Sequence, residues 1–484
     1  MNEQFRVSQK IGLMFHHNTP LPDDIKSWAI SQLHSKSPAL GVSTSLSKKI
    51  EEWPQSLQPN LEKRDDMFSL YKMNRHKEKE KREGQESPKA VQENYRKNLM
   101  GVTDELKFAH RNVHGKDQVK LRFTSFWANH FTTGNIHDNQ NHIGHAIEKA
   151  ILANLNGNFD LMLYKVTSHP AMLVYLDNIW SAGENSAYAR NQRAQNQHAG
   201  LNDNLGRELL ELHTVSPSAK YTETDIKNAA KVLAGWGTAT DFKSKNELIR
   251  MGGTTNTWDF FKKDYAEPGV KNVMGKTINQ GKGGLREMTN FLAAHDHTVN
   301  HISTKLAQHF VSDNPSTTDI NYIKDAWKKS NGNLDKIHVA VIERAILSKE
   351  PKFQWPMTWF FQVLRLSNAS FLNGWNQRFE YSDSLMRNKD IFIELGQGFW
   401  HTRQPNGYSS DKNEWISGEM FERRIRFAEA IYKKGGPRFK AQDIMDRISA
   451  NDTTRKLVAS AGGNQLKQFI ALMCSPEIMG LEDA

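Results

Sequence analysis

The chain has 484 residues, of which 38% are hydrophobic and 24% charged, a balance typical of a soluble globular protein rather than a disordered one. The formal net charge of +10 comes from 64 basic and 54 acidic residues. Because acidic residues are interspersed among the basic ones, this excess does not indicate specific nucleic-acid binding. Cys474 is the single cysteine, which excludes an intrachain disulfide.

Membrane and export signals are both missing from the printed sequence. No apolar run approaches the roughly 18 residues needed to cross a bilayer, so we expect no transmembrane segment. The first ten residues, MNEQFRVSQK, lack the apolar segment of an export signal, so no signal peptide is visible in this chain.

The first 110 residues predict helices, a loop and a charged arm. Residues 5–35 read as two helices around a turn at Pro20–Pro22, and residues 37–60, rich in Ser, Pro and Asn, read as a loop. Residues 61–97 are highly charged, and alternating signs at 77–83 suit i,i+4 pairs on an exposed helix. We therefore expect a solvated helical arm.

Amphipathic patterns from Val119 onward predict further helices. The expected helices cover about 121–131, 142–164 with a break near Gly157, a segment starting at Pro170, 203–213, 226–234, 285–294, 298–311, 320–329, 337–347, 357–366, 419–434 and 442–473. Residues 181–199 are polar and predict a loop, as does the stretch 137–145 with its three histidines. Thr222 and Asp225 form a capping box that opens the helix at 226–234.

These elements predict a mostly α fold, a multi-helical globular domain with few short strands. Residues 238–284, rich in Gly, Asn, Thr and Lys, predict a loop-rich insertion with a small β element. The expected organisation is N-terminal helices and loop at 1–60, the charged helical arm at 61–110, and a main helical domain at 111–484.

The most informative segment is 200–215, because its helical spacing sorts polar from apolar side chains. Asn204, Arg207, Glu208 and Glu211 fall at i, i+3, i+4 and i+7 on one face, while leucines 205, 209 and 212 lie on the other. His213 follows at the C-terminal end, where the helix dipole favours a cation. Such a stripe is either a solvated face or the wall of a site.

Several segments together match one family, in that family's order, over about residues 5–480. They are Phe126–Phe131 (FWANHF), Pro170–Asn178 with Ser181, Gly183, Asn185 and Ser186, Gly200–Thr214, Tyr221–Asp225, Leu233–Trp236, His301–Val311, Leu395–Gln397 and Pro405–Gly407. The chain thus resembles the bacterial family called domain of unknown function 1800 (DUF1800). Such a set of motifs in order is far more specific than any one of them.

The resemblance implies little about the reaction, since the family has no settled activity. Its members often carry an export signal and are frequently encoded beside DUF1501 proteins, which look like sulfatase or alkaline-phosphatase relatives. This implies a bacterial envelope or exported location and a DUF1501-like partner. The chain departs from the family pattern at Ala266, where a histidine is usual, and at Asp203, where glutamate is usual.

The residues suggest a polar cleft between the 121–131 and 203–213 helices, closed by 181–199 and by 264–271. Candidate catalytic residues are Glu208, Glu211, His130 and His213, and candidate substrate-binding residues are Asn129, Asp177, Asn178, Asn202, Asn204 and Arg207. Burying such groups unpaired costs about 1–3 kcal/mol each, so they must meet one another, a ligand or water. A divalent metal on the carboxylates and imidazoles is one possibility.

Each candidate also has a structural interpretation. Arg207 and Glu211, four residues apart, suit an intrahelical ion pair that leaves Glu208 to pair elsewhere. Asp177 and Asn178 suit bonds to backbone amides at the end of their helix. A lone histidine such as His130 on an apolar helix is usually a satisfied core residue.

Two functions from different classes follow. The first is an envelope enzyme that carries out acid/base or metal-assisted hydrolysis on an anionic substrate such as a polysaccharide, with Arg207 holding the anionic group. The second is a non-catalytic scaffold or partner protein whose polar network only makes the core rigid.

Overall fold

The computed structural model describes residues 1–16, 19–35, 42–43, 48–49, 59–65, 100–135, 139–238, 257–369, 391–402, 404–435 and 440–482. Its first half contains α1 (Glu3–Ile11), α2 (Ile25–Leu33), β1 (Val42–Ser43), β2 (Lys48–Lys49), α5 (Met100–His114), α6 (Gln118–His130), α7 (Gln140–His145), η2 (Ala146–Ile151), η3 (Leu152–Asn154), α8 (Phe159–Thr167), α9 (Pro170–Tyr175), η4 (Asn178–Trp180), α10 (Ala187–Ala194), α11 (Asn204–Glu211), η5 (Pro217–Ala219) and α12 (Glu223–Leu233).

The second half is also helical apart from one hairpin. It contains η7 (Thr257–Asp259), η8 (Lys263–Tyr265), β3 (Lys271–Val273), β4 (Lys276–Ile278), α14 (Gly283–Ala294), α15 (Asp296–Phe310), α16 (Thr317–Lys329), α17 (Leu334–Leu347), α18 (Pro356–Leu366), η9 (Lys412–Glu414), α20 (Gly418–Gly435), α21 (Ala441–Ile448), α22 (Asp452–Ser460), α23 (Gln465–Met473) and α24 (Pro476–Met479). Each described strand pair is antiparallel: β1 with β2, and β3 with β4. The fold is mostly α, as predicted.

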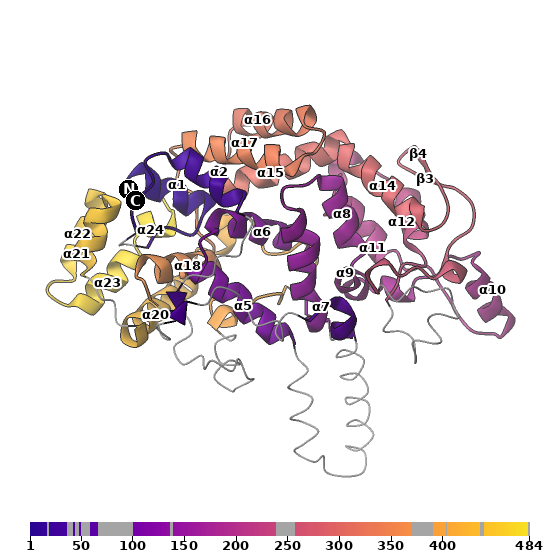
Figure 1. Cartoon of the computed structure of the whole chain (residues 1–484), viewed down its shortest axis with the longest axis horizontal. Coiled ribbons are helices and arrows are strands. Elements are labelled where there is room, and N and C mark those ends of the chain that lie inside the picture. Colours follow the sequence, from indigo (N-terminus) through magenta and orange to yellow (C-terminus); the bar gives the residue numbers. More distant parts are fainter. Residues whose placement is uncertain are drawn as a thin grey trace, which may run out of the picture.

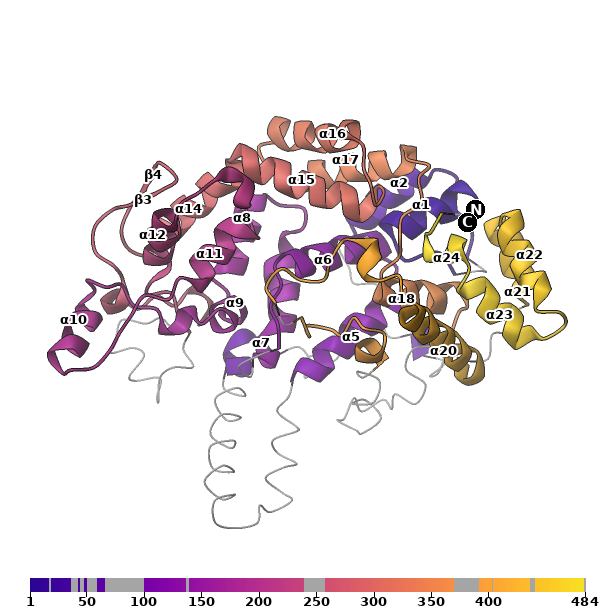
Figure 2. The ribbon, with the colours of Figure 1, turned by 180° about the vertical axis from the view of Figure 1, so that it is seen from behind.

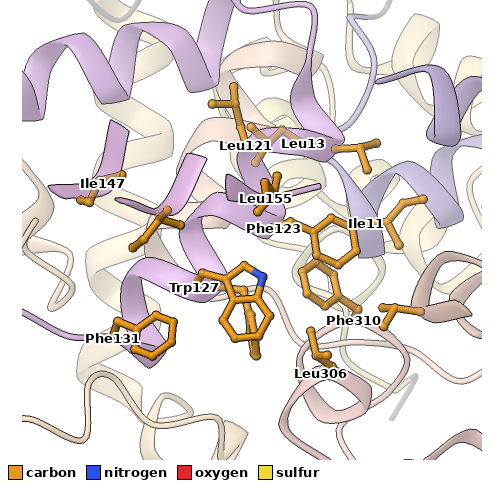
Figure 3. Packing of buried hydrophobic residues seen from close by; sticks show 14 of the residues in the cluster. Ile11, Leu13, Leu121, Phe123, Trp127, Phe131, Ile147, Leu155, Leu306 and Phe310 are labelled. Carbon is orange, nitrogen blue, oxygen red and sulfur yellow. The ribbon is translucent and has the colours of Figure 1, made fainter. Parts of the chain in front are cut away.

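Helix α6 lies at the centre of the molecule, with α15, α16 and α17 along one side and α5 and α7 on the opposite side (Figure 1). Its rings pack against those helices: the Phe123 and Phe310 centroids are 4.3 Å apart, and the Trp127 indole N–H donates to His338 Nε2 over 3.0 Å. Figure 3 shows Phe123, Trp127 and Phe310 packed together with Leu306. The aromatic pattern that predicted a buried helix here is thereby explained.

The molecule is elongated, with α21–α23 at one end and α10 at the other, in both views (Figures 1 and 2). The two ends of the chain lie side by side near α24. Asn2 donates its amide to Ile448 O over 2.7 Å, and Gln9 Nε2 donates to the carbonyls of Glu477 and Ile478 over 3.0 Å. Residues from opposite ends of the sequence thus share one packed region.

Local sequence signals explain several helix boundaries. The predicted capping box is present, since Thr222 Oγ1 accepts from the Asp225 amide and Asp225 accepts from the Thr222 amide. Pro170 occupies the first turn of α9, where its missing N–H costs nothing. Gly235, which follows the end of α12, has a φ of 98°, a backbone conformation that favours glycine.

Two local predictions were wrong. Residues 181–199 contain α10 rather than only a loop, whereas the run 442–473 is helical as expected, in the three helices α21 to α23. His142 and His145 were placed on a surface loop but lie in α7 and are 0% and 7% exposed. His137, from the same stretch, lies outside the described residues.

The predicted charged arm can be assessed only at its ends, because residues 66–99 lie outside the described part of the chain. Those ends are not solvated. Arg64 and Asp104 form an ion pair at 2.6 Å, each side chain 1% exposed. Arg64 therefore anchors the start of the segment in the core, against the expectation for 61–97. Of the helices described here, none combines the length and apolar character that crossing a membrane requires.

Candidate functional site

Helix α11 carries the polar stripe that the sequence predicts. Leu205 and Leu209 are fully buried, Glu208 and Glu211 are half-buried, and Asn204 is exposed. The helix packs closely on α12 through Gly206, where a Cβ would lie 2.8 Å from the Ala230 amide nitrogen. Close contact between backbones fixes the stripe on the outer side of α11.

Arg207 is already occupied by acidic partners. Its Nη1 and Nη2 each donate to a carboxylate oxygen of Glu223 over 3.0 Å, and Nη2 also contacts Asp203 at 3.2 Å. The hydrogen bond to Glu223 raises the pKa of Arg207 above its usual value. The intrahelical Arg207–Glu211 pair is not the arrangement found. The expected role of Arg207 in holding a substrate anion therefore has no geometric support.

Glu208 and Glu211 form an acidic pair, one turn apart on α11. Neither carboxylate makes a hydrogen bond or ion pair with a residue that the structure describes. Burial, and then repulsion from Glu211, raises the pKa of Glu208. Glu208 therefore holds a proton more readily than an ordinary glutamate does.

Two tyrosines flank this acidic pair. Burial and the Glu208 charge raise the pKa of Tyr175 on α9 to about 12, and the buried Tyr175 hydroxyl has no partner. Burial and then Glu211 raise the pKa of Tyr221, which precedes α12. The pair is thus bordered by two neutral phenols, which can donate hydrogen bonds to a ligand oxygen.

A second cluster, which we call the basic cluster, consists of His130, His213, His301 and Lys305. The His130 ring lies 6.2 Å from that of His213 and 6.4 Å from that of His301, measured between centroids. His130 Nε2 lies 3.2 Å from the His213 carbonyl oxygen, and His301 Nε2 lies 3.3 Å from the Leu212 carbonyl oxygen. The cluster surrounds the residues that directly follow α11.

The basic cluster contains several unsatisfied groups. Both ring nitrogens of His213 and Nδ1 of His130 are buried without a partner. Burial, followed by the charge of Lys305, lowers the pKa of His213 to about 3 and that of His301 to about 4, and places the pKa of His130 well below its usual value. Burial alone lowers the pKa of Lys305 to about 8. The imidazoles are therefore neutral at pH 7.

The acidic pair and the basic cluster are neighbours but do not merge. The His213 amide donates to the Glu208 carbonyl over 3.0 Å, which joins them through the backbone. The charges that shift the pKa of Glu208 are Glu211 and Arg207, whereas those that shift His213 and His301 include Lys305 and no acid. The structure thus brings His130 to His213 and Glu208 to Glu211, and the single shared pocket that the sequence suggests remains a prediction.

Two of the remaining candidates, Asn129 and Asn178, form hydrogen bonds with the backbone of other segments. Asn129 exchanges two hydrogen bonds with the Tyr408 backbone, over 3.0 and 2.8 Å, on another face of α6. Asn178 is 1% exposed and donates to the carbonyls of Leu233 and Trp236. These contacts are long-range, unlike the local amide bonds that the structural interpretation of Asn178 expected.

Three further candidates lie at helix boundaries. Asp177 has a φ of 55° in the left-handed region, directly before η4. The Asn202 side-chain oxygen accepts from the Asn204 amide over 3.0 Å, just before α11. Asn204 does not meet the other polar groups, since it is exposed. Within the described residues, no group of three or more His, Cys, Asp or Glu side chains is arranged to hold a metal ion.

A family model described as "Protein of unknown function (DUF1800)" matches residues 21–477. The chain belongs to the DUF1800 family. No curated protein and no solved structure matches it. Membership explains the order of the motifs, and it assigns no reaction to the DUF1800 chain.

Two DUF1800 segments expected to close the cleft bind each other. The Asn185 amide and Nδ2 donate to the Glu267 carboxylate over 2.9 and 2.7 Å, and the Tyr188 and Tyr265 rings stack at 3.9 Å. Ala266, where the family usually has histidine, lies between Tyr265 and Glu267, the two residues that make these contacts. The Ser181 hydroxyl accepts from the Asn202 amide, so the contact between the two segments lies beside the start of α11.

Sequence reasoning missed Tyr175, Tyr221, His301 and Lys305. A signal existed for two of them: His301 and Lys305 lie four residues apart in a DUF1800 motif, so they share one face of α15. The tyrosines gave no comparable signal, because each reaches Glu208 or Glu211 only through tertiary packing.

Proposed function

We propose that this DUF1800 protein is a hydrolase that uses Glu208 and Glu211 as an acid/base pair on a polysaccharide. The observation that carries the proposal is the isolation of two adjacent carboxylates, half-buried and without a hydrogen-bonding or ionic partner in the described structure. Structural carboxylates of this protein are bonded, as Asp104 and Glu223 are. Leaving two together unpaired has a cost that a catalytic role explains.

The raised pKa of Glu208 assigns the two roles. Protonated Glu208 donates its proton to the leaving oxygen while the C–O bond breaks. Ionised Glu211 takes a proton from the attacking water, whose oxygen forms the new C–O bond. Glu208 ends ionised and Glu211 protonated, and exchange with solvent restores both. The phenol of Tyr221 borders the pair and offers a donor to a substrate hydroxyl.

The net charge of +10 favours accumulation at an anionic polymer such as an acidic polysaccharide. An envelope location and a DUF1501-like partner are part of the proposal through family association alone. The reaction written here needs no metal, and its described groups supply both proton transfers.

Single substitutions of the acidic pair test the proposal. We expect Glu208→Gln and Glu211→Gln to lower the release of reducing ends from a panel of neutral and acidic bacterial polysaccharides about 100-fold or more. Glu223→Gln is the matched control, since it alters a carboxylate one helix away that binds Arg207. Its turnover should stay near wild type.

Stability measured on the same variants separates catalysis from structure. An unpaired carboxylate contributes little to folding, so both glutamine variants should keep or raise the melting temperature. Wild-type protein that releases nothing from any polysaccharide of the panel would contradict the proposal, as would turnover retained in both variants.

A scaffold is the second candidate, and one observation favours it. Asn129 and Asn178 bind the backbone of distant segments, as expected of a network that only makes the core rigid. On that view, Glu208→Gln should leave every function intact, whereas Asn178→Ala should lower the melting temperature because two buried carbonyls lose their donor.

A further inference from the structure

A cavity of about 80 Å³ lies between α5, α6, α18, residues 397–402 and Tyr408. Aromatic side chains make up much of its wall, namely Phe108, Trp355, Phe361, Phe399, Trp400 and Tyr408. A single water needs only about 10–15 Å³, so the space suits a larger guest. The cavity lies away from the acidic pair, since none of its lining residues belongs to α11.

Arg122 lines this cavity and has no acidic partner among the residues that the structure describes. Its side chain is 3% exposed and bonds only neutral oxygens, Thr358 Oγ1 at 2.9 Å and the Lys10 carbonyl at 3.4 Å. Its Nε is buried with no partner. Burial lowers the pKa of Arg122 to about 9, and no acidic group counters that shift.

Two other buried arginines of the chain are satisfied. Arg64 is paired with Asp104, and Arg365 donates to four backbone carbonyls. A buried cation that lacks both kinds of compensation is costly. Arg122 is therefore a buried cation for which the described residues supply no anionic partner.

Two more unsatisfied polar atoms line the same cavity. Asn112 Oδ1, from α5, and Thr402 Oγ1, from the segment after Trp400, are both buried without a partner. A guanidinium donor from α6 and a hydroxyl donor from the segment after Trp400 thus border one cavity. Buried polar groups are normally satisfied, and both of these groups can donate to a ligand oxygen. Asn112 Oδ1 can only accept, so a ligand carboxylate leaves it unpaired.

We propose that this cavity binds a small organic acid, with its carboxylate on Arg122 and its apolar part against the aromatic wall. A planar carboxylate matches the guanidinium fork and carries the single charge that Arg122 lacks. The aromatic rings exclude water from the pair, which strengthens it. The site is independent of the acidic pair on α11.

Matched ligands test the charge requirement. We expect benzoate and hexanoate to bind the purified full-length chain in isothermal titration calorimetry and to raise its melting temperature. Benzamide and hexanamide, which have the same shape without the charge, should bind at least tenfold more weakly. Trp355 and Trp400 line the cavity, so their fluorescence should change with the carboxylates.

Two variants test the location by different routes. Arg122→Met removes the unpaired charge, a change that buried sites tolerate, and should abolish the preference for carboxylate over amide. Ala128→Leu keeps Arg122 but fills part of the cavity, and should weaken both ligand series. Arg344→Met is the control, because that arginine already has Asp319 at 2.7 Å and lies outside the cavity lining.

Three results would each overturn the proposal. The first is equal affinity for acid and amide. The second is unchanged benzoate binding in both Arg122→Met and Ala128→Leu. The third is no heat or thermal shift with any acid at millimolar concentration, which would mean that the cavity holds water only.

Discussion

His213 is 1% exposed and His338 is fully buried, and burial lowers the pKa of both to about 3. The unfolded chain has ordinary histidines with a pKa of about 6.5. Between these values the unfolded state binds the proton and the native state does not, so the free energy of unfolding falls as the pH falls from 6.5 towards 3. At pH 5 each such histidine removes about 2 kcal/mol.

We therefore predict marked acid sensitivity that begins near pH 6.5. Several buried histidines act together, namely His110, His145, His213, His301 and His338, and their sum is comparable to a whole domain's stability of about 5–15 kcal/mol. Urea unfolding at pH 7.5, 6 and 5 measures the effect. His338→Gln should make the fall between pH 7.5 and 5 smaller by about 2 kcal/mol.

The exposed His198 provides the control for this prediction, because substitution to glutamine there changes no buried group. Its pH dependence should match wild type. A stability that stays constant from pH 7.5 to 5 would contradict the burial of these imidazoles in neutral form.

Single residues also show where sequence reasoning stops. The stripe Asn204, Arg207, Glu208, Glu211 follows from helical spacing alone, and α11 has it. The partner of Arg207 is Glu223, sixteen residues onward on α12, and no local rule selects it over Glu211. Ion pairs between helices depend on tertiary packing. The helical spacing therefore predicted the polar face of α11 but not the residues on α12 that this face contacts.

Among the elements, α11 and α12 depend on a glycine at their contact. At Gly206, a Cβ would meet the Ala230 amide nitrogen at 2.8 Å and the Ile226 carbonyl at 3.1 Å. Backbone atoms cannot move aside as a flexible side chain can. Helix α11, which carries Glu208 and Glu211, therefore lies at a distance from α12 that only a glycine at position 206 allows.

We predict that Gly206→Ala destabilises the protein by about 1–3 kcal/mol through overpacking, although alanine is the better helix former by about 1 kcal/mol. Gly283→Ala is the matched control: that glycine is also helical, and nothing lies within 4 Å of its Cβ position. Urea denaturation should show the control neutral or stabilised. A stabilised Gly206→Ala variant would mean that α11 and α12 are not in backbone contact.

Helix α10 shows why one element was missed and others were not. Helices α14 to α18 carry apolar stripes, and sequence placed each of them within a few residues. In α10 only Ala189 is buried, so it has no such stripe. Its Ser186 cap and the stacking of Tyr188 on Tyr265 hold it instead, and the second of these is visible only after folding.

At the scale of the whole molecule, Glu477 connects three segments. Its carboxylate accepts from the Asn451 amide over 3.1 Å and from Thr454 Oγ1 over 2.9 Å, at the start of α22. Its carbonyl accepts from Gln9 of α1. The position of α24 thus supports both α22 and α1.

We predict that Glu477→Ala lowers the free energy of unfolding by about 2 kcal/mol or more, because the amide and hydroxyl at the start of α22 lose their acceptor. Hydrogen exchange should speed up in α22, α24 and α1 and stay unchanged in α8. Glu482→Ala is the control, since that side chain is 70% exposed and reaches Lys412 only at 3.7 Å. Faster exchange confined to α24 would contradict the coupling to α1.

The contact between α1 and residues 447–478 also sets an order of events during synthesis. Helix α1 is translated early, yet the carbonyls that Gln9 binds belong to residues translated more than 460 positions later. Until then its apolar side chains, Phe5 and Val7 among them, lack part of their final surroundings. More than 460 further residues must therefore be made before α1 can reach its native contacts, an interval in which its apolar side chains are open to aggregation.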